Sequence, residues 1–244
     1  MSEIINAAAY QFVPLTELPA LRTQLLDRAN ALGLMGTVLL SPEGINLFVA
    51  GTEDAVEAFL ATVRALPGLA GLKAKLSRSD HQPFGHMRVK LKREIIAFGV
   101  EGIDPARKPA PKISPQTLKQ WLDEGKKLTL LDTRNTYEVE AGTFRGALNP
   151  KIRTFREFPA AVKRLPPEVK ENPVVMFCTG GIRCEKAGPL LAREGYQVFQ
   201  LEDGILGYFE ACGGAHYDGT CFVFDERGGV DESLAPAAPP HPGS

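Results

Sequence analysis

Apolar positions in the N-terminal part of the chain switch repeatedly between the spacing of a strand and that of a helix. Ala7 to Val13 is a short apolar run, whereas the leucines between Pro14 and Leu32 recur at near-helical intervals. Two β-rich runs flank the turn Ser41-Pro42-Glu43-Gly44, and Thr52 is placed to cap a second helix. The predicted strands are 7–13, 36–40, 45–50, 72–77 and 87–98, and the predicted helices are 14–32 and 52–65. The order of the first six elements, β-α-β-β-α-β, predicts a ferredoxin-like (acylphosphatase-like) α+β domain over residues 1–99.

A second pattern begins after residues 100–113, which are rich in proline and charge and are predicted to be a linker. Ser114-Pro115 is typical of a helix start. Apolar runs then alternate with helical stretches, which predicts a doubly wound parallel sheet with helices on both faces over residues 114–212. The predicted strands are 128–132, 174–178 and 197–201. Residues 213–244 form a C-terminal extension whose Pro/Ala-rich tail, from Leu234 onward, is expected to be disordered.

Composition narrows the class of protein without deciding it. The chain has 244 residues, 44% of them hydrophobic, which is enough for two modest cores. A net charge of −1 means that any contact with nucleic acid must rest on a local patch. Four cysteines in this length do not indicate a disulfide scaffold. The chain shows no signal peptide and no apolar run of the roughly 18 residues that span a membrane, so we expect a cytoplasmic protein with no membrane association. The sequence indicates no particular protein partner.

The chemistry of the chain centres on Cys178. A fully apolar strand ends in this cysteine, a glycine-bearing loop follows, and a helix begins near Cys184. In a doubly wound sheet, ligands bind beyond the carboxyl ends of the strands, where this loop falls. Backbone N–H groups of such a loop and of a helix N-terminus stabilise an anion, so Cys178 is predicted to be a reactive thiolate or persulfide. The residues predicted to stabilise that anion are Thr179, Gly180, Gly181, Ile182 and Arg183.

Two other interpretations fit this loop less well. Cys178 could be an inert core cysteine, but a core cysteine does not need to be followed by the loop sequence Thr-Gly-Gly-Ile-Arg. A protein tyrosine phosphatase cradle needs five residues between its cysteine and its arginine, whereas four separate Cys178 from Arg183. The arginine is therefore out of register for clamping a phosphate.

The second half of the chain resembles a rhodanese domain. Asp132-Thr133-Arg134, Glu138, Gly142 and Gly146-Ala147 follow the stretch shared by rhodaneses, and Gly204-Ile205 with Tyr208 matches its closing segment. A ferredoxin-like domain with Glu43-Gly44-Ile45-Asn46, the loop extended by Cys-Glu-Lys, and the run Cys221-Phe-Val-Phe-Asp together resemble one family over nearly the whole chain. That family is the rhodanese-like tRNA uridine hydroxylases, which form 5-hydroxyuridine at the wobble position in an oxygen-dependent reaction.

The resemblance implies an active-site cysteine at Cys178 that works as a persulfide, molecular oxygen as co-substrate, and tRNA as partner. No other cofactor is evident. Many members continue into a cysteine-rich segment after Cys221, which this chain lacks, so a zinc site is not expected. Leu47-Phe48 follows Glu43-Gly44-Ile45-Asn46 where members usually carry Gly-Thr, which leaves the role of that turn open.

Several other polar residues carry competing interpretations. Asp132, Arg134 and Glu138 are expected to form a charged network that supports the loop rather than to act directly in catalysis. Cys184 is either a helix-packing residue, which we favour, or a resolving thiol for Cys178. Cys212 and His216 lack metal-ligand spacing, and no metal site is predicted.

A basic stretch in the first domain is the candidate RNA-binding surface. Arg88, Lys90 and Lys92 share one face of a predicted strand, while Val89 and Leu91 are expected to face the core. Such a row of cations suits RNA phosphates, although by itself it is more typical of a solvated sheet face. Together with the family resemblance it predicts tRNA binding. His86, just before the row, is a weaker candidate for contacting a base.

The sequence thus predicts an enzyme that hydroxylates the wobble uridine of tRNA through Cys178. Two alternatives stay open. One is a sulfurtransferase that passes a persulfide sulfur to a thiol or to a thiolated tRNA. The other is a binding module that senses oxidation through Cys178 and Cys184.

Overall fold

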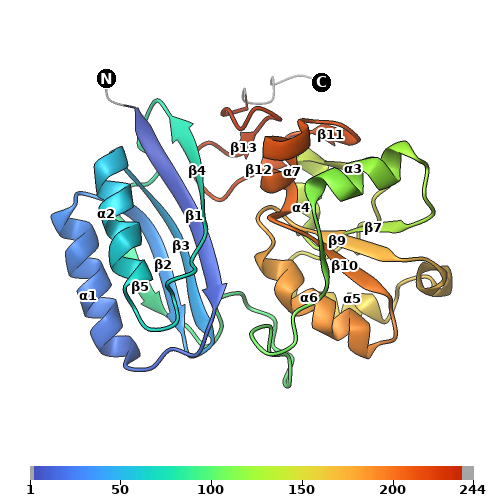
Figure 1. The fold of residues 1–244 in the computed structure, drawn as a ribbon, viewed down its shortest axis with the longest axis horizontal. Helices are drawn as coiled ribbons and strands as arrows, with labels where there is room; N and C mark the ends of the chain where they lie inside the picture. The colour runs from blue at the N-terminus through green and yellow to red at the C-terminus, as the bar shows by residue number, and fades with distance from the viewer. Residues whose placement is uncertain (1–2, 238–244) are drawn as a thin grey trace. The chain divides into compact units, whose positions relative to one another are not determined.

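The structure is a computed structural model that describes residues 3–237, and the chain divides into two compact units, Met1–Ala97 and Phe98–Ser244. In the first unit, helices lie on one face of a single sheet (Figure 1). Its elements are β1 (Ile4–Phe12), α1 (Leu18–Ala31), β2 (Met35–Ser41), β3 (Gly44–Gly51), α2 (Glu53–Arg64), β4 (Ala74–Ser79) and β5 (Met87–Leu91).

The first sheet has the strand order β4-β1-β3-β2-β5. β1 pairs antiparallel with β3 and β4, and β2 pairs antiparallel with β3, which gives the predicted ferredoxin-like sheet. β5 adds a further edge strand, parallel to β2. The apolar sides of α1 and α2 pack on this sheet and enclose a core whose members include Leu25, Val38, Leu47 and Phe59.

The helix boundaries follow local chemistry. Thr52 caps α2 as predicted, its side chain accepting a hydrogen bond from the N–H of Ala55. The predicted helix over residues 14–32 begins only at Leu18. The backbone N–H groups of Val13 and Leu15 bond instead to carbonyls of the β2–β3 turn, which keeps this stretch extended.

The turn between β2 and β3 has a structural role that its sequence left open. The Glu43 carboxylate accepts a hydrogen bond of 2.8 Å from the N–H of Ile95, and the Asn46 amide donates to the carbonyl of Ile95 at 3.3 Å. The backbone N–H and carbonyl of Ile95 are therefore both hydrogen-bonded to side chains of this turn rather than to a neighbouring strand. Accordingly, the strand predicted over residues 87–98 ends at Leu91.

The second unit is built on a four-stranded sheet with the order β6-β10-β9-β7, in which every pairing is parallel. Helices α3 and α7 pack together on one face, and α5 and α6 on the other, as Figure 1 shows. The sheet and helix elements are β6 (Lys112–Ile113), α3 (Pro115–Asp123), β7 (Thr129–Asp132), α4 (Thr136–Ala141), β8 (Gly142–Phe144), η1 (Phe155–Glu157), α5 (Phe158–Val162), η2 (Pro167–Glu171), β9 (Val174–Phe177), α6 (Ile182–Arg193), β10 (Val198–Leu201) and α7 (Gly204–Cys212). This is the predicted doubly wound arrangement.

Of two predicted boundaries around residue 113, one differs from the structure and one agrees with it. The predicted linker over residues 100–113 ends in a strand, since Lys112 and Ile113 pair with Gln200 and Leu201 of β10 and thereby cover one edge of the sheet. Ser114 caps α3 as expected, accepting from the N–H of Thr117 at 3.1 Å.

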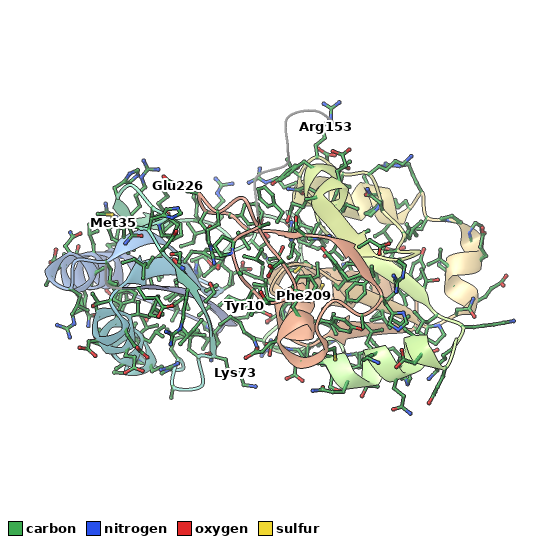
Figure 2. All side chains as sticks on the ribbon, turned by 90° about the horizontal axis from the view of Figure 1, so that it is seen from above. Tyr10, Met35, Lys73, Arg153, Phe209 and Glu226 are labelled. Atoms are coloured by element: carbon green, nitrogen blue, oxygen red, sulfur yellow. The ribbon has the colours of Figure 1, made fainter. Side chains whose placement is uncertain are left out.

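The C-terminal extension folds onto the second unit. Its strands are β11 (Tyr217–Gly219), which pairs with β8, and the hairpin formed by β12 (Cys221–Phe222) and β13 (Gly229–Val230). Phe209 of α7, labelled in Figure 2, packs edge-on against Tyr217 with ring centroids 4.9 Å apart. The start of the predicted disordered tail is also placed, because the N–H of Ala237 bonds to the carbonyl of Gly229. The rest of that tail, residues 238–244, lies outside the described residues.

None of the helices in residues 3–237 combines the length and the apolar character that crossing a membrane requires.

Candidate active site

Cys178 follows directly after β9, the strand that lies between β10 and β7. Every residue of β9 is buried, and so is the Cys178 side chain. The cysteine therefore lies at the carboxyl end of an interior parallel strand, where the following loop and helix direct their N–H groups inward. The apolar run ending in a cysteine predicts this position.

Hydrogen-bond donors and a positive charge surround the Cys178 sulfur. The backbone N–H of Gly181 donates to Sγ at 3.1 Å, and the N–H of Arg183 and the thiol of Cys184 donate as well. Burial raises the pKa of Cys178. The Cys184 hydrogen bond, the Arg183 charge and the two N–H groups together outweigh burial and lower the pKa to about 6. At neutral pH the sulfur is therefore a thiolate, the nucleophilic form.

The five residues of the predicted anion-binding loop do different things. Gly181, with a φ of +96° that favours glycine, and Arg183 hold the sulfur. Ile182 opens α6. Thr179 and Gly180 are half-buried, and a side chain added at Gly180 would meet nothing within 4 Å. Thr179 and Gly180 therefore form the open side of the loop.

The back of the loop rests on the N-terminus of α7. The N–H groups of Ile205 and Leu206 donate to the carbonyls of Cys178 at 2.9 Å and of Thr179 at 3.1 Å. Gly204 has a φ of +63°, and a Cβ there would lie 2.4 Å from the Cys178 carbonyl oxygen. Only glycine allows α7 to approach the loop this closely.

Arg183 is held by Glu138 in a buried, two-pronged ion pair. Its Nη1 and Nη2 lie 2.6 and 2.7 Å from the two carboxylate oxygens, and both side chains are almost fully buried. The same carboxylate accepts from the N–H of Asn135 at 3.1 Å, which fixes it at the start of α4. Glu138 thus sets where the positive charge of Arg183 lies relative to Cys178.

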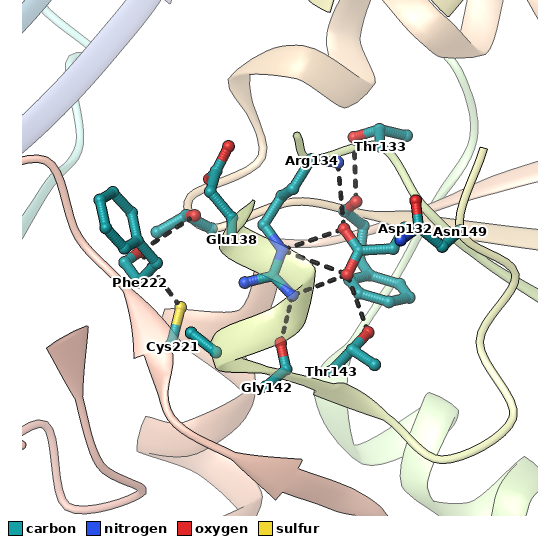
Figure 3. Close-up of polar contacts among 12 residues, drawn as sticks. Asp132, Thr133, Arg134, Glu138, Gly142, Thr143, Asn149, Cys221 and Phe222 are labelled. Carbon is teal, nitrogen blue, oxygen red and sulfur yellow. Dashed lines mark hydrogen bonds and ion pairs between the residues drawn. The ribbon is translucent and has the colours of Figure 1, made fainter. Parts of the chain in front are cut away.

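Asp132 and Arg134 form a second buried ion pair, drawn in Figure 3. Arg134 bonds to both oxygens of Asp132 and donates to the carbonyl of Gly142 at 2.6 Å, while Thr143 donates to Asp132 at 2.8 Å. These bonds connect the end of β7 to β8. That this pair supports the loop rather than acting directly in catalysis stays a prediction.

Cys184 turns its thiol toward Cys178 from the first turn of α6. Its Sγ also lies 3.6 Å from the Thr133 hydroxyl. Burial and the neighbouring thiolate raise the pKa of Cys184, so its thiol stays protonated and donates a hydrogen bond to the Cys178 sulfur. The sequence indicated either helix packing or a resolving thiol for Cys184, and this donor role was not among those predictions. The spacing of six residues from Cys178 predicts that Cys184 lies near the loop, but it does not predict the direction of the Cys184 side chain.

The C-terminal extension contributes aromatic side chains that were not among the predicted site residues. The Thr179 hydroxyl donates to the carbonyl of Phe222 at 3.5 Å, which attaches β12 to the loop. The neighbouring Cys221 is buried, which raises its pKa to about 12 and keeps its thiol protonated. The run Cys-Phe-Val-Phe, with aromatic residues at alternate positions, was the sequence feature that could have indicated these site residues.

The basic strand lies in the first unit. Arg88, Lys90 and Lys92 are exposed, and Val89 between them is buried as predicted. Leu91 does not face the core. It is 41% exposed, because β5 is the edge strand and ends there. Contact of the three cations with RNA stays a prediction.

Within residues 3–237 the structure contains no group of three His, Cys, Asp or Glu side chains arranged to hold a metal ion. His216 instead pairs with Asp123, its Nε2 lying 2.7 Å from a carboxylate oxygen. Cys212 is half-buried on α7.

Comparison with protein families agrees with both halves of the fold. Residues 4–95 match the family described as the UPF0176 acylphosphatase like domain, and residues 114–211 match the rhodanese-like domain. A rhodanese-related protein from Thermoplasma volcanium aligns at 24% identity over 42% of this chain and 93% of that chain, with a TM-score of 0.36. The cysteine loop on a doubly wound sheet and the family match define a rhodanese-domain protein.

The full chain is similar to proteins named tRNA uridine(34) hydroxylase. The protein of Variovorax paradoxus (strain S110) is 53% identical over 98% of this chain and 93% of that protein. Those of Bordetella petrii and Bordetella avium are 50% and 51% identical over 97% and 96% of this chain and over 96% and 99% of those proteins. The chain belongs to the tRNA uridine(34) hydroxylase family.

Proposed function

We propose that this protein hydroxylates the wobble uridine of tRNA at C5, giving 5-hydroxyuridine, and that the reaction requires Cys178 as a thiolate or as a persulfide on that sulfur. The observation that carries the proposal is the Cys178 site itself. A buried sulfur with a pKa of about 6 lies in a chain that belongs to this family over nearly its full length. Because the proposed substrate is tRNA, we propose that the reaction takes place in the cytoplasm.

The proposed reaction uses molecular oxygen and a thiol reductant. The C5–H bond of uridine breaks and a C5–O bond forms with one atom of O2. The second oxygen atom leaves as water, for which two electrons and two protons are needed. Two thiols supply them by joining into a disulfide, so uridine, O2 and two thiols give 5-hydroxyuridine, water and one disulfide. Cellular thiols are the reductant in this scheme.

The residues around Cys178 have separate tasks in this proposal. The N–H groups of Gly181 and Arg183 and the Cys184 thiol keep the sulfur anionic while it is buried. Glu138 holds the Arg183 guanidinium in place. Arg88 and Lys90 on β5, and Lys92 directly after it, bind tRNA phosphates.

The test is mass spectrometry of tRNA nucleosides from a strain lacking this gene, complemented with variants. Wild type should restore 5-hydroxyuridine and Cys178→Ser should not, because a hydroxyl group is a far weaker nucleophile at neutral pH and carries no persulfide. Cys212→Ser, at a cysteine outside the loop, is the matched control and should restore the nucleoside. Wild-type levels with Cys178→Ser, expressed and folded normally, would contradict the proposal.

The rhodanese-type loop also supports a second candidate, sulfur transfer. A thiolate held by loop N–H groups can attack the outer sulfur of thiosulfate, which forms a cysteine persulfide and releases sulfite, and an acceptor thiolate can then take that sulfur and regenerate the Cys178 thiolate. Turnover of thiosulfate by wild type, with unchanged 5-hydroxyuridine in the deletion strain, would favour this alternative.

A further inference from the structure

Three aromatic side chains form a connected row beside the Cys178 loop. The rings of Tyr137 and Phe222 meet edge to face with centroids 5.3 Å apart, and those of Phe222 and Phe224 meet in the same way at 5.3 Å. Tyr137 is 45% exposed and Phe224 is 51% exposed. Among the described residues of the second unit, these two are the large hydrophobic side chains open to solvent.

The row is attached to the active-site loop at more than one point. The guanidinium carbon of Arg183 lies 5.7 Å from the Phe224 ring centroid, within the range of a cation–π contact. The Phe222 carbonyl accepts a hydrogen bond from the hydroxyl of Thr179, and Thr179 directly follows Cys178. Tyr137 precedes Glu138, the partner of Arg183. The exposed rings thus lie next to the same residues that hold the thiolate.

The rings are also held in place before any ligand arrives. Phe222 belongs to β12, which pairs with β13, and the Tyr137 hydroxyl accepts a hydrogen bond of 3.2 Å from the Asn135 amide. Asp225, directly after Phe224, is fixed by a two-pronged pair with Arg227, with distances of 2.8 and 2.6 Å. Preorganised rings lose little conformational freedom on binding.

We propose that Tyr137, Phe222 and Phe224 form an aromatic platform on which a base of the substrate RNA stacks, so that the target uridine is held over the Cys178 loop. This inference rests on the proposed function and identifies how that site recognises its substrate. Single-stranded RNA bases are recognised by stacking on aromatic rings and on arginine, because every base presents a flat π face. An exposed apolar patch alone would also suit a protein partner. The cation beside the rings and the neighbouring thiolate favour a nucleobase.

The platform also accounts for how a buried sulfur meets its substrate. Cys178 is fully buried, whereas Thr179 and Gly180 form the open side of its loop. The Thr179 hydroxyl contacts the platform strand β12. A base splayed out of the anticodon loop and stacked on the rings is therefore directed to the open side of the loop.

The test compares ring-removing with ring-preserving variants. Phe224→Ala and Tyr137→Ala are paired with Phe224→Tyr and Tyr137→Phe, and Leu76→Ala, at a side chain that is also 51% exposed but lies on β4, is the control. The substrate is an anticodon stem-loop RNA. Each alanine variant should raise KM or Kd by about 5-fold to 150-fold, the effect of losing one stacking contact. The ring-preserving variants and the control should stay within about twofold of wild type.

A spectroscopic readout separates stacking from a merely structural role. An anticodon stem-loop carrying 2-aminopurine at the wobble position should lose fluorescence on binding wild type, because stacking on a ring quenches that base. Phe224→Ala should abolish this quenching at saturating protein while the pH midpoint of Cys178 alkylation stays near 6. Unchanged KM and unchanged quenching in both alanine variants would overturn the platform and leave the patch as a protein-docking surface.

The two proposals fail in distinguishable ways. If wild type makes 5-hydroxyuridine but the alanine variants bind RNA normally, the platform is wrong and the proposed function stands. If wild type makes no 5-hydroxyuridine yet its quenching of the wobble base depends on Phe224, the proposed reaction is wrong and the base-stacking platform stands.

Discussion

Replacing Cys184 with alanine removes the S–H group that donates to the Cys178 thiolate. This hydrogen bond is the largest of the effects that lower the Cys178 pKa. A hydrogen bond to a charged group contributes about 1.5–3 kcal/mol, and a thiol, as a weak donor, belongs near the lower end. Since about 1.4 kcal/mol corresponds to one pKa unit, Cys184→Ala should raise the pKa of Cys178 from about 6 by about one unit.

The direction of the pH effect follows from which form of Cys178 is favoured. Its pKa is depressed, so the thiolate persists above pH 6 in wild type and is protonated below it. In Cys184→Ala the thiolate fraction at pH 7 should fall from about 90% to about 50%. Below pH 6 both proteins should lose reactivity about tenfold per pH unit.

The assay is the pH dependence of alkylation of Cys178 by iodoacetamide, followed by mass spectrometry of the peptide that contains it. Cys184→Ser is the matched control, since its hydroxyl keeps a donor at the same place, and its midpoint should stay near that of wild type. A midpoint in Cys184→Ala within about 0.2 of wild type, with circular dichroism unchanged, would refute the donor role. Loss of 5-hydroxyuridine in Cys184→Ser as complete as in Cys178→Ser would instead make Cys184 a resolving thiol.

Two further predictions concern the support of the loop and the basic strand. Gly204→Ala, which places a Cβ at positive φ and 2.4 Å from a loop carbonyl, should lower the free energy of unfolding by about 2–4 kcal/mol in urea titrations, whereas Gly180→Ala should change it by less than about 0.5 kcal/mol. The triple change Arg88→Ala, Lys90→Ala, Lys92→Ala should weaken tRNA binding by about tenfold or more and reduce the slope of log K against log salt by up to about 3, measured by titration at several salt concentrations.

Each of these predictions has a clear opposite result. Equal stability of the two alanine variants would mean that α7 does not need its close approach to the loop. An unchanged salt slope in the triple variant would show that the basic strand is only a solvated sheet face. In that variant the alkylation midpoint of Cys178 should stay near 6, because the three cations are absent from the interactions that set its pKa.

Local sequence patterns determined the class of fold and the reactive residue. Strand and helix periods are set by neighbours a few positions apart, so the order of elements in the first unit and three of the four sheet strands of the second could be predicted from apolar spacing. The step from a buried strand through Cys178 to a glycine-bearing loop is local too. Capping by Thr52 and Ser114 involves residues only three positions away and was equally readable.

Predicted element boundaries were wrong where a residue distant in sequence forms hydrogen bonds with the backbone groups that a strand would use. The predicted strand 87–98 stops early because Glu43 and Asn46, far back in the chain, take the N–H and carbonyl of Ile95. Leu91 faces solvent because its strand lies at the sheet edge, which the alternation of apolar and polar positions does not reveal. The sequence alone does not state which strand will be an edge.

The arrangement of the site was decided by tertiary structure. Glu138 reaches Arg183 across 45 positions of sequence, Gly204 lies against the Cys178 carbonyl, and Phe222 meets the loop from the C-terminal extension. These residue types are visible in the sequence but their partners are not, because each contact joins segments that are far apart in the chain and meet only in the folded unit. The charge on Cys178 follows from those contacts: a buried thiol alone would be neutral, and the groups gathered around it by the fold make it a thiolate.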